Sequence, residues 1–249
     1  VAEVQQPESA KQAIDWFENK INKTITEIDE SYCKYRISEA LMGTYRLVWD
    51  DFCSWYLEIV KPNYGSPIDS TTYAKTIEQL EKILKLLHPF MPFLTEEIWH
   101  LIDDRKEDII VANWPKAGTV KEQLLADFEN TTEVVAGIRT IRKEQNIANK
   151  EQLELLVIDN QKSSNNLTAI IAKLGNLSTI DTTTEKPNGA FSFMVKSNEY
   201  FIPLNDNIDV AAEIEKLQKE LDYTKGFLKS VEGKLSNERF VNNAPEQVV

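Results

Sequence analysis

The residue types that most often perform catalysis or bind metal ions are scarce in this sequence. His88 and His100 are its only histidines, and Cys33 and Cys53 are its only cysteines. The two histidines stand 12 positions apart with no cysteine between them, a spacing that matches no familiar zinc motif. A cysteine–histidine nucleophilic pair stays open on spacing alone, but no third residue that would orient it is indicated. We therefore predict structural or surface histidines, no metal site, and cysteines that are small buried residues.

Loops that bind phosphate groups are also missing from the sequence. The eight glycines fit neither G-x-G-x-x-G nor G-x-x-x-x-G-K-[ST]. Acidic residues are too numerous for any two carboxylates to be singled out as a general acid and base. We therefore predict no catalytic residue in this chain.

Aromatic and basic residues offer a different chemistry, the binding of nucleic acid. Trp49 and Trp55 could stack on bases, but their helical spacing favours the core. Tyr35 and Arg36 fall between two expected helices and are better candidates for exposed stacking, with an ordinary loop tyrosine as the alternative. A second group of basic residues, at 139–143, lies at the end of a long expected helix. These residues could also bind nucleic acid, or they could simply form a helix face exposed to solvent.

These side chains must be positioned by helices in the first 148 residues, where apolar residues recur at steps of three and four. The first run extends from Ile14 to Ile28, and the second runs from Ser38, a good N-cap, to Lys61-Pro62. The predicted buried face of the second run is Leu41, Tyr45, Val48, Phe52, Trp55 and Ile59. Four such helices with short connections, followed by a long helix from Lys121, predict a mainly α fold built on an antiparallel helical bundle.

The pattern changes near residue 151. Strands are expected at 153–158, 177–180, 190–196 and 200–204, with a helix at 165–174 that Gly175 closes, which together predict a small α+β unit. From Val210 to Leu235 apolar residues alternate strictly at four and three, as in a coiled-coil helix. Residues 242–245 (NNAP) predict a turn into a second helix, so we expect a fragment truncated inside a helical hairpin. The predicted domains are 1–150, 151–205 and 206–249.

The composition is that of a folded protein with an acidic surface. Hydrophobic residues make up 42% and charged residues 27% of the chain, and the net charge is −12. This charge repels phosphate at long range, so contacts with RNA must come from local basic patches. No apolar run approaches the roughly 18 residues that span a bilayer. Two cysteines without a disulfide framework favour a reducing compartment, the cytoplasm.

Three strings of residues in the helical region carry a resemblance to a known family. Residues 35–40 (YRISEA), 45–58 (YRLVWDDFCSWYLE) and 86–99 (LLHPFMPFLTEEIW) closely resemble the anticodon-binding helical bundle of the class I aminoacyl-tRNA synthetases for valine, isoleucine and leucine. Residues 235–249 (LSNERFVNNAPEQVV) look like the hairpin of the C-terminal coiled-coil arm of the valyl enzymes. The chain thus resembles the C-terminal region of valyl-tRNA synthetases.

The resemblance implies tRNA binding without catalysis. The family's catalytic H-x-G-H motif cannot be present, because the two histidines are too far apart, and its K-M-S-K-S loop is not found. The chain is therefore expected to need no cofactor, while the longer protein would use ATP and Mg²⁺. The implied partners are the tRNA for valine, an N-terminal catalytic domain and the second helix of the arm, with no membrane.

The resemblance also assigns candidate contacts with tRNA. Two lysines lie on the first bundle helix, a tyrosine and an arginine lie at the loop end of the bundle that should meet bases, and a basic stretch is expected on the phosphate backbone. These candidates are Lys20, Lys23, Tyr35, Arg36, Arg139, Arg142 and Lys143.

Two alternatives stay open. The chain could come from an isoleucyl or leucyl enzyme, or it could be a helical protein–protein interaction module with no role in RNA binding. The acidic balance favours the module, whereas the basic clusters and the three long strings speak against it.

Overall fold

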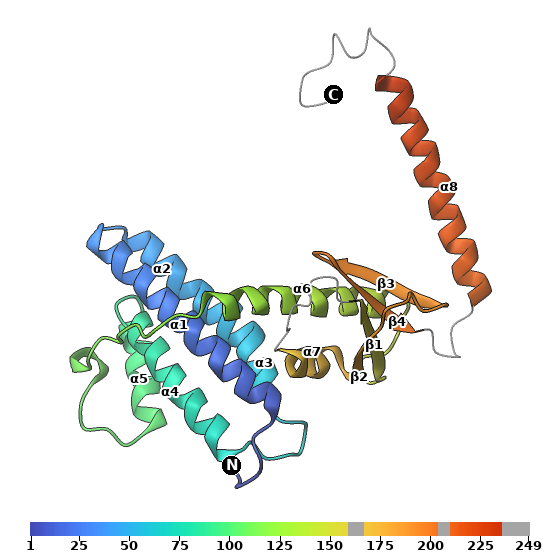
Figure 1. Cartoon of the computed structure of the whole chain (residues 1–249). Coiled ribbons are helices and arrows are strands. Elements are labelled where there is room, and N and C mark those ends of the chain that lie inside the picture. The colour runs from blue at the N-terminus through green and yellow to red at the C-terminus, as the bar shows by residue number, and fades with distance from the viewer. Residues whose placement is uncertain (159–166, 204–209, 236–249) are drawn as a thin grey trace. The chain divides into compact units, whose positions relative to one another are not determined.

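The structure is a computed structural model that describes residues 1–158, 167–203 and 210–235 (Figure 1). Its contacts divide the chain into one compact unit, Val1–Pro203, and a second unit, Leu204–Val249. Each unit is described by itself.

The first unit holds a helical bundle followed by a small sheet, which confirms the predicted fold class (Figure 1). The bundle consists of α1 (Glu8–Cys33), α2 (Ile37–Arg46), the π-helix η1 (Leu47–Tyr56), α3 (Leu57–Val60), α4 (Ser70–Leu87), α5 (Pro92–Ile102) and the short 3₁₀ helix η2 (Ile109–Val111). The elements that follow are α6 (Glu122–Glu144), β1 (Leu153–Ile158), α7 (Thr168–Gly175), β2 (Leu177–Thr182), β3 (Ala190–Val195) and β4 (Asn198–Pro203).

The bundle core is built on the apolar face of α1. Ile14, Phe17, Ile21, Ile25 and Ile28 are each at most 7% exposed, so the predicted face is confirmed. The ring of Phe17 stacks on that of Tyr56, 4.8 Å away between centroids. Burial raises the pKa of Tyr56 to about 12, and its hydroxyl lies 2.9 Å from the hydroxyl of Thr76.

The second run forms a continuous helix from Ile37 to Val60 whose middle part is π-helical. Its buried residues are Ala40, Thr44, Leu47, Phe52, Tyr56, Ile59 and Val60. The step of five from Leu47 to Phe52 falls inside η1, where the hydrogen bonds of a π-helix span one more residue than those of an α-helix. The buried face before this step is therefore one position away from the face that a regular period predicts.

This shift makes part of the predicted face wrong. Leu41 is 40% exposed, Tyr45 50% and Trp49 60%, although all three were expected in the core. Phe52 and Ile59, which lie beyond the step of five, are buried as predicted. Trp55 is partly buried, with its ring edge-on to Phe128 at 5.8 Å.

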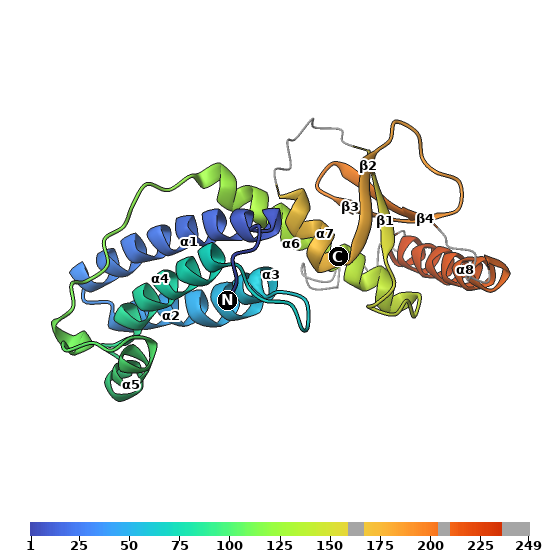
Figure 2. The same ribbon diagram turned by 90° about the horizontal axis from the view of Figure 1, so that it is seen from below.

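Helix α6 supplies side chains to two cores. Near its start, Leu125 and Phe128 pack in the bundle, where Phe128 stacks on Trp16 at 3.5 Å between ring centroids. Farther on, Val134 and Ile138 pack against the sheet. Figure 2 shows α6 running from the bundle to the strands. The predicted boundary at 150/151 therefore falls within one compact unit rather than between two.

The sheet has the strand order β2-β1-β4-β3. Strands β1 and β2 are parallel and are joined through α7, whereas β4 is antiparallel to both β1 and β3. The residue that ends α7 in the left-handed conformation is Asn176 (φ 49°), not Gly175 as predicted. All four predicted strands are otherwise found within two residues of their expected bounds.

The second unit contains the helix α8 (Val210–Leu235), which confirms the predicted helix. Among its described side chains, Leu221, Tyr223, Phe227 and Leu228 are exposed. The predicted turn at 242–245 lies outside the described residues. None of the described helices combines the length and the apolar character required to cross a membrane.

Candidate nucleic-acid interface

The turn between α1 and α2 presents an exposed tyrosine in an unusual backbone conformation. Tyr35 has φ 57°, in the left-handed region that favours glycine or asparagine. The N–H of Arg36 donates to the carbonyl of Ser31 (2.8 Å) and the N–H of Tyr35 to that of Tyr32 (3.0 Å), the two bonds of a Schellman motif. The side chain of Tyr35 is 89% exposed, so no packing offsets the strain. Its ring is available to a partner.

Arg36 follows Tyr35 in the chain and is also exposed. Its guanidinium contacts only one carboxylate among the described residues, that of Glu39, at 3.4 Å and on the surface. An exposed pair of this kind contributes little free energy and exchanges readily for another anion. Tyr35 and Arg36 therefore offer a flat ring and a cation side by side, as predicted from their place between the helices.

A row of exposed apolar side chains extends from the same turn along α2 into η1. It comprises Ile37, Leu41, Tyr45 and Trp49, which stand four residues apart. The rings of Tyr45 and Trp49 are nearly parallel, with 8° between their planes and 6.4 Å between centroids. Paired exposed rings can serve as a stacking platform for unpaired bases.

A cleft of about 510 Å³ opens between α1 and α2 at this end of the bundle. Arg46, Ser31 and Ser38 line it together with two acidic residues, Glu27 and Glu39. The two carboxylates outnumber the single cation, so this cleft suits the hydroxyl groups of a sugar better than a phosphate.

A second cleft, of about 260 Å³, lies between α1, η1 and α6. Lys20, Lys23 and Trp55 line it, and the guanidinium of Arg139 lies 5.7 Å from the centre of the Trp55 ring. Three of the predicted basic residues are thus gathered around one tryptophan. Lys20 lies 13 residues from the end of α1 at Cys33, or about 20 Å at the helical rise of 1.5 Å per residue.

Both lysines of this cleft are paired with carboxylates. Lys20 lies 3.5 Å from Asp51 and Lys23 lies 2.8 Å from Glu122. The hydrogen bond to Glu122 raises the pKa of Lys23. Burial raises the pKa of the Asp51 carboxyl, an effect that the neighbouring Lys20 partly offsets. An incoming phosphate would have to compete with these two carboxylates for the lysines.

Arg142 is not placed to meet a phosphate, and this corrects the prediction. It is 5% exposed, and its guanidinium donates to four backbone carbonyls, those of Ala148 (3.0 Å), Glu151 (2.9 Å), Gly175 (2.8 Å) and Asn176 (3.2 Å). Burial lowers its pKa. Arg142 thus holds the end of α6 to the turn between α7 and β2. Arg139 and Lys143, which belong to the same predicted set, are exposed.

The histidines and cysteines play no part in these two clefts. Nδ1 of His88 lies 2.7 Å from the hydroxyl of Thr95, an arrangement that suits a structural histidine. Cys33 and Cys53 are exposed free thiols, contrary to the prediction that they are buried. Among the described residues, one group of three side chains, Glu96, His100 and Asp108, is close enough together to hold a metal ion.

Comparison with known proteins identifies the bundle. The profile of the anticodon-binding domain of tRNA ligases matches residues 15–157, more than half of the chain. The chain belongs to this family. The profile of the tRNA-binding arm of valyl-tRNA synthetase matches residues 209–249. Together these matches confirm the predicted resemblance to valyl-tRNA synthetases.

Similar proteins cover the whole chain. Valine--tRNA ligase of Christiangramia forsetii is 54% identical over 248 residues, or 99% of this chain. The enzyme of the same name from Parabacteroides distasonis is 48% identical over 99% of the chain, and that from Enterococcus faecalis is 36% identical over 94%. The chain spans 28% of the length of each of these relatives.

Within this anticodon-binding domain, the exposed pair of Tyr45 and Trp49 was not predicted from the sequence. The signal was present, because Ile37, Leu41, Tyr45 and Trp49 form a row at steps of four. Leu41 and Tyr45 were predicted to be buried because steps of four and three assume a regular α-helical period through η1, and Trp49 was predicted to be buried because of its helical spacing. The smaller residues Ala40 and Thr44 are the ones that face the bundle.

Proposed function

We propose that this chain binds the tRNA for valine, with the bundle on the anticodon stem and loop and the α8 segment supporting the outer corner of the tRNA. The observation that carries the proposal is the exposed, strained Tyr35 beside Arg36, in a domain of the anticodon-binding family. An aromatic ring without contacts of its own suits unstacked loop bases, which proteins read by stacking and hydrogen bonding.

In this proposal, two parts of the bundle contact two different parts of the tRNA. Tyr35, Arg36 and the Tyr45–Trp49 pair contact bases of the anticodon loop. Lys20, Lys23, Arg139 and Lys143 contact the phosphates of the stem. Contacts with phosphates position the RNA, while contacts with bases supply identity.

The longer protein is proposed to be a valine--tRNA ligase that acts in the cytoplasm. The part of its relatives that this chain does not span would hold the catalytic domain, which binds ATP and Mg²⁺ and attaches valine to the tRNA. This chain contributes no catalytic residue to that reaction. Its exposed free cysteines suit a reducing compartment.

Titration of the chain with two tRNAs tests the proposal. Fluorescent valine and isoleucine tRNAs are titrated at about 50 and 200 mM salt, together with a valine tRNA whose anticodon has been changed. We expect a preference for the valine tRNA that the anticodon change abolishes. Equal affinity for the two tRNAs that falls steeply with salt would support tRNA binding by this chain. It would also mean that the rest of the longer protein selects the valine tRNA.

A protein–protein interaction module is the second candidate function. The exposed Leu221, Phe227 and Leu228 of α8 favour it, because apolar helix faces often bind another helix. A chain that is folded by circular dichroism but binds neither tRNA at low salt would support this module and contradict the tRNA proposal.

A further inference from the structure

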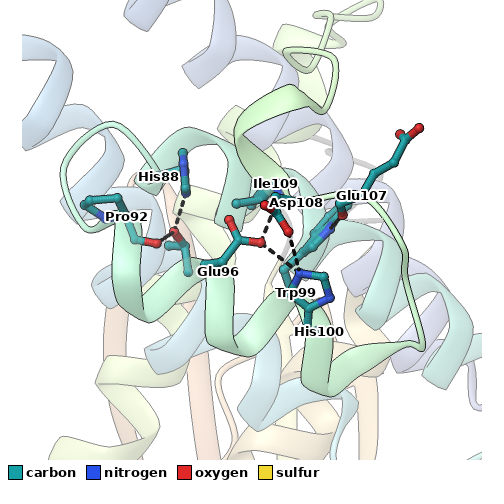
Figure 3. A network of polar contacts seen from close by, with 9 residues as sticks. His88, Pro92, Glu96, Trp99, His100, Glu107, Asp108 and Ile109 are labelled. Atoms are coloured by element: carbon teal, nitrogen blue, oxygen red, sulfur yellow. Dashed lines mark hydrogen bonds and ion pairs between the residues drawn. The ribbon is translucent and has the colours of Figure 1, made fainter.

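Three potential metal ligands converge where α5 meets the loop that follows it (Figure 3). Glu96 and His100 lie one turn apart on α5, and Asp108 lies at the end of the loop. The Nε2 atom of His100 is 3.0 Å from Oε1 of Glu96 and 3.2 Å from Oδ1 of Asp108. One nitrogen therefore faces two carboxylate oxygens that come from different segments.

The loop holds Asp108 in this position through both of its neighbours. The indole Nε1–H of Trp99 donates to the carbonyl of Glu107 (3.2 Å), and the N–H of Ile109 donates to Oε1 of Glu96 (3.1 Å). The side chain of Ile109 is 3% exposed and packs with Leu84 and Trp99. Asp108 is thus placed by a buried anchor and two hydrogen bonds that do not involve its own carboxylate.

The rest of the loop is fixed to the same tryptophan. The guanidinium of Arg105 lies 3.7 Å from the centre of the Trp99 ring and also pairs with Glu81 on α4. The loop is therefore tied to α4 and α5 independently of the three ligands. Such support from surrounding residues is a general feature of metal sites whose ligands are held ready for the ion.

We propose that Glu96, His100 and Asp108 bind one zinc ion. A ring nitrogen carries at most one hydrogen, whereas a cation at the common point binds all three atoms at once. Ligand atoms about 2.0–2.1 Å from a tetrahedral zinc ion lie about 3.3 Å apart. The two distances from Nε2 of His100 are near this value, and all three ligand atoms lie within 4.8 Å of one another.

The chemistry of the site suits zinc rather than magnesium. One imidazole with two carboxylates is a set that zinc accepts, whereas magnesium prefers oxygen ligands alone. Oε1 of Glu96 accepts the N–H of Ile109 and keeps a second lone pair for the ion. Residues 96–108 include six acidic residues and two basic ones, so the local field attracts a cation. His100 and Asp108 are exposed, which leaves a fourth position open to water.

The site goes beyond the proposed tRNA binding and does not depend on it. Its ion would hold the loop 103–108 against α5, which is a structural role. The prediction of no metal site considered only the spacing of the histidines and cysteines, and it did not include the carboxylates that this loop brings to His100.

Calorimetric titration of the whole chain with ZnCl₂ tests the proposal, in a background with Cys33→Ser and Cys53→Ser because exposed thiols also bind zinc. We expect one zinc ion per chain and a melting temperature that rises by at least about 3 °C at saturation. His100→Gln and Asp108→Asn should each weaken binding at least about tenfold. The matched controls, His88→Gln and Asp104→Asn, should bind as the background does.

The visible absorption of bound cobalt reports on the ligands of the ion directly, and a change in the stability of the fold would not alter it. Co²⁺ in place of zinc should give the visible absorption of a four-coordinate site, and His100→Gln should abolish it. The proposal is overturned if the background binds no zinc at millimolar concentration, because the three side chains would then form only an ion pair. Equal binding by all four variants would overturn it as well, since the zinc would then be bound elsewhere.

Discussion

The backbone of Tyr35 has a positive φ that disfavours any side chain, whereas its ring is proposed to bind a base. A single substitution to glycine tests both effects. A non-glycine residue in the left-handed region is strained by roughly 1–2 kcal/mol. Glycine removes this strain, although its freedom in the unfolded chain offsets part of the gain. We expect Tyr35→Gly to raise the free energy of unfolding by about 0.5–1 kcal/mol in urea denaturation.

The same change should weaken tRNA binding. Loss of a base–aromatic stack costs about 1–3 kcal/mol, or roughly 5- to 150-fold in affinity. Tyr35→Phe keeps the ring and should bind normally, and Tyr64→Ala, at another fully exposed tyrosine, is the matched control. A more stable Tyr35→Gly protein with unchanged affinity would show that Tyr35 only fills a turn.

Arg142 and Lys143 are neighbours in sequence with opposite expected behaviour. Arg142→Met leaves four carbonyls without their charged donor, so unfolding should become easier by at least about 3 kcal/mol. Lys143→Ala should change stability by less than about 0.5 kcal/mol and lower the slope of log affinity against log salt by about one. Denaturation and salt titration of both variants check the pair. A stable Arg142→Met protein with a lower salt slope would restore Arg142 to the phosphate contacts.

At the scale of elements, the sequence predicts a segment well wherever its period is regular. The face of α1, the strands and the long α6 follow from steps of three and four or from short apolar runs bounded by turns. Between Leu47 and Phe52 the spacing of buried residues changes to five, and the conformational preferences of single residues do not predict a π-helix. The row at steps of four that contains Tyr45 and Trp49 is visible in the sequence, but this shift in period decides that the row is exposed rather than buried.

The packing of α6 on β3 depends on a glycine whose role the sequence does not reveal. A Cβ atom on Gly137 would lie 2.3 Å from Cδ2 of Phe193. Alanine gains about 1 kcal/mol as a helix former, whereas overpacking costs about 1–3 kcal/mol. We therefore expect Gly137→Ala to lower the free energy of unfolding by up to about 2 kcal/mol, measured by urea denaturation.

A double-mutant cycle tests the stated cause. In a Phe193→Leu background, Gly137→Ala should lose most of its penalty, because the ring that it meets is gone. Gly226→Ala on α8 is the control and should not destabilise, because no described residue outside its own stretch of helix backbone lies within 4 Å of the added Cβ. An equal penalty with and without Phe193 would place the cause in the helix backbone.

At the scale of the whole molecule, the surroundings of a candidate residue can be predicted from the sequence where they depend on local structure. They cannot be predicted where they depend on contacts with residues far away in the chain. The exposure of Tyr35 and Arg36 was predicted correctly because it follows from a local turn. Arg142 was misplaced because its partners Gly175 and Asn176 lie more than 30 positions away. The group of Glu96, His100 and Asp108 was missed because a loop, not a spacing, brings its members together.

The net charge of −12 leads to a prediction about the rate of tRNA binding. Acidic protein and RNA repel each other at long range, and raising salt from about 10 to 150 mM shortens the screening length from about 30 to 8 Å. Local contacts between basic side chains and phosphates weaken over the same range. We expect the association rate constant to stay flat or to rise with salt while the dissociation rate constant rises steeply, as measured by stopped-flow fluorescence.

Asp104→Asn with Glu107→Gln should speed association at 10 mM salt only. An association rate that falls with salt would mean that the clefts around Lys20 and Arg46 steer the RNA in spite of the net charge.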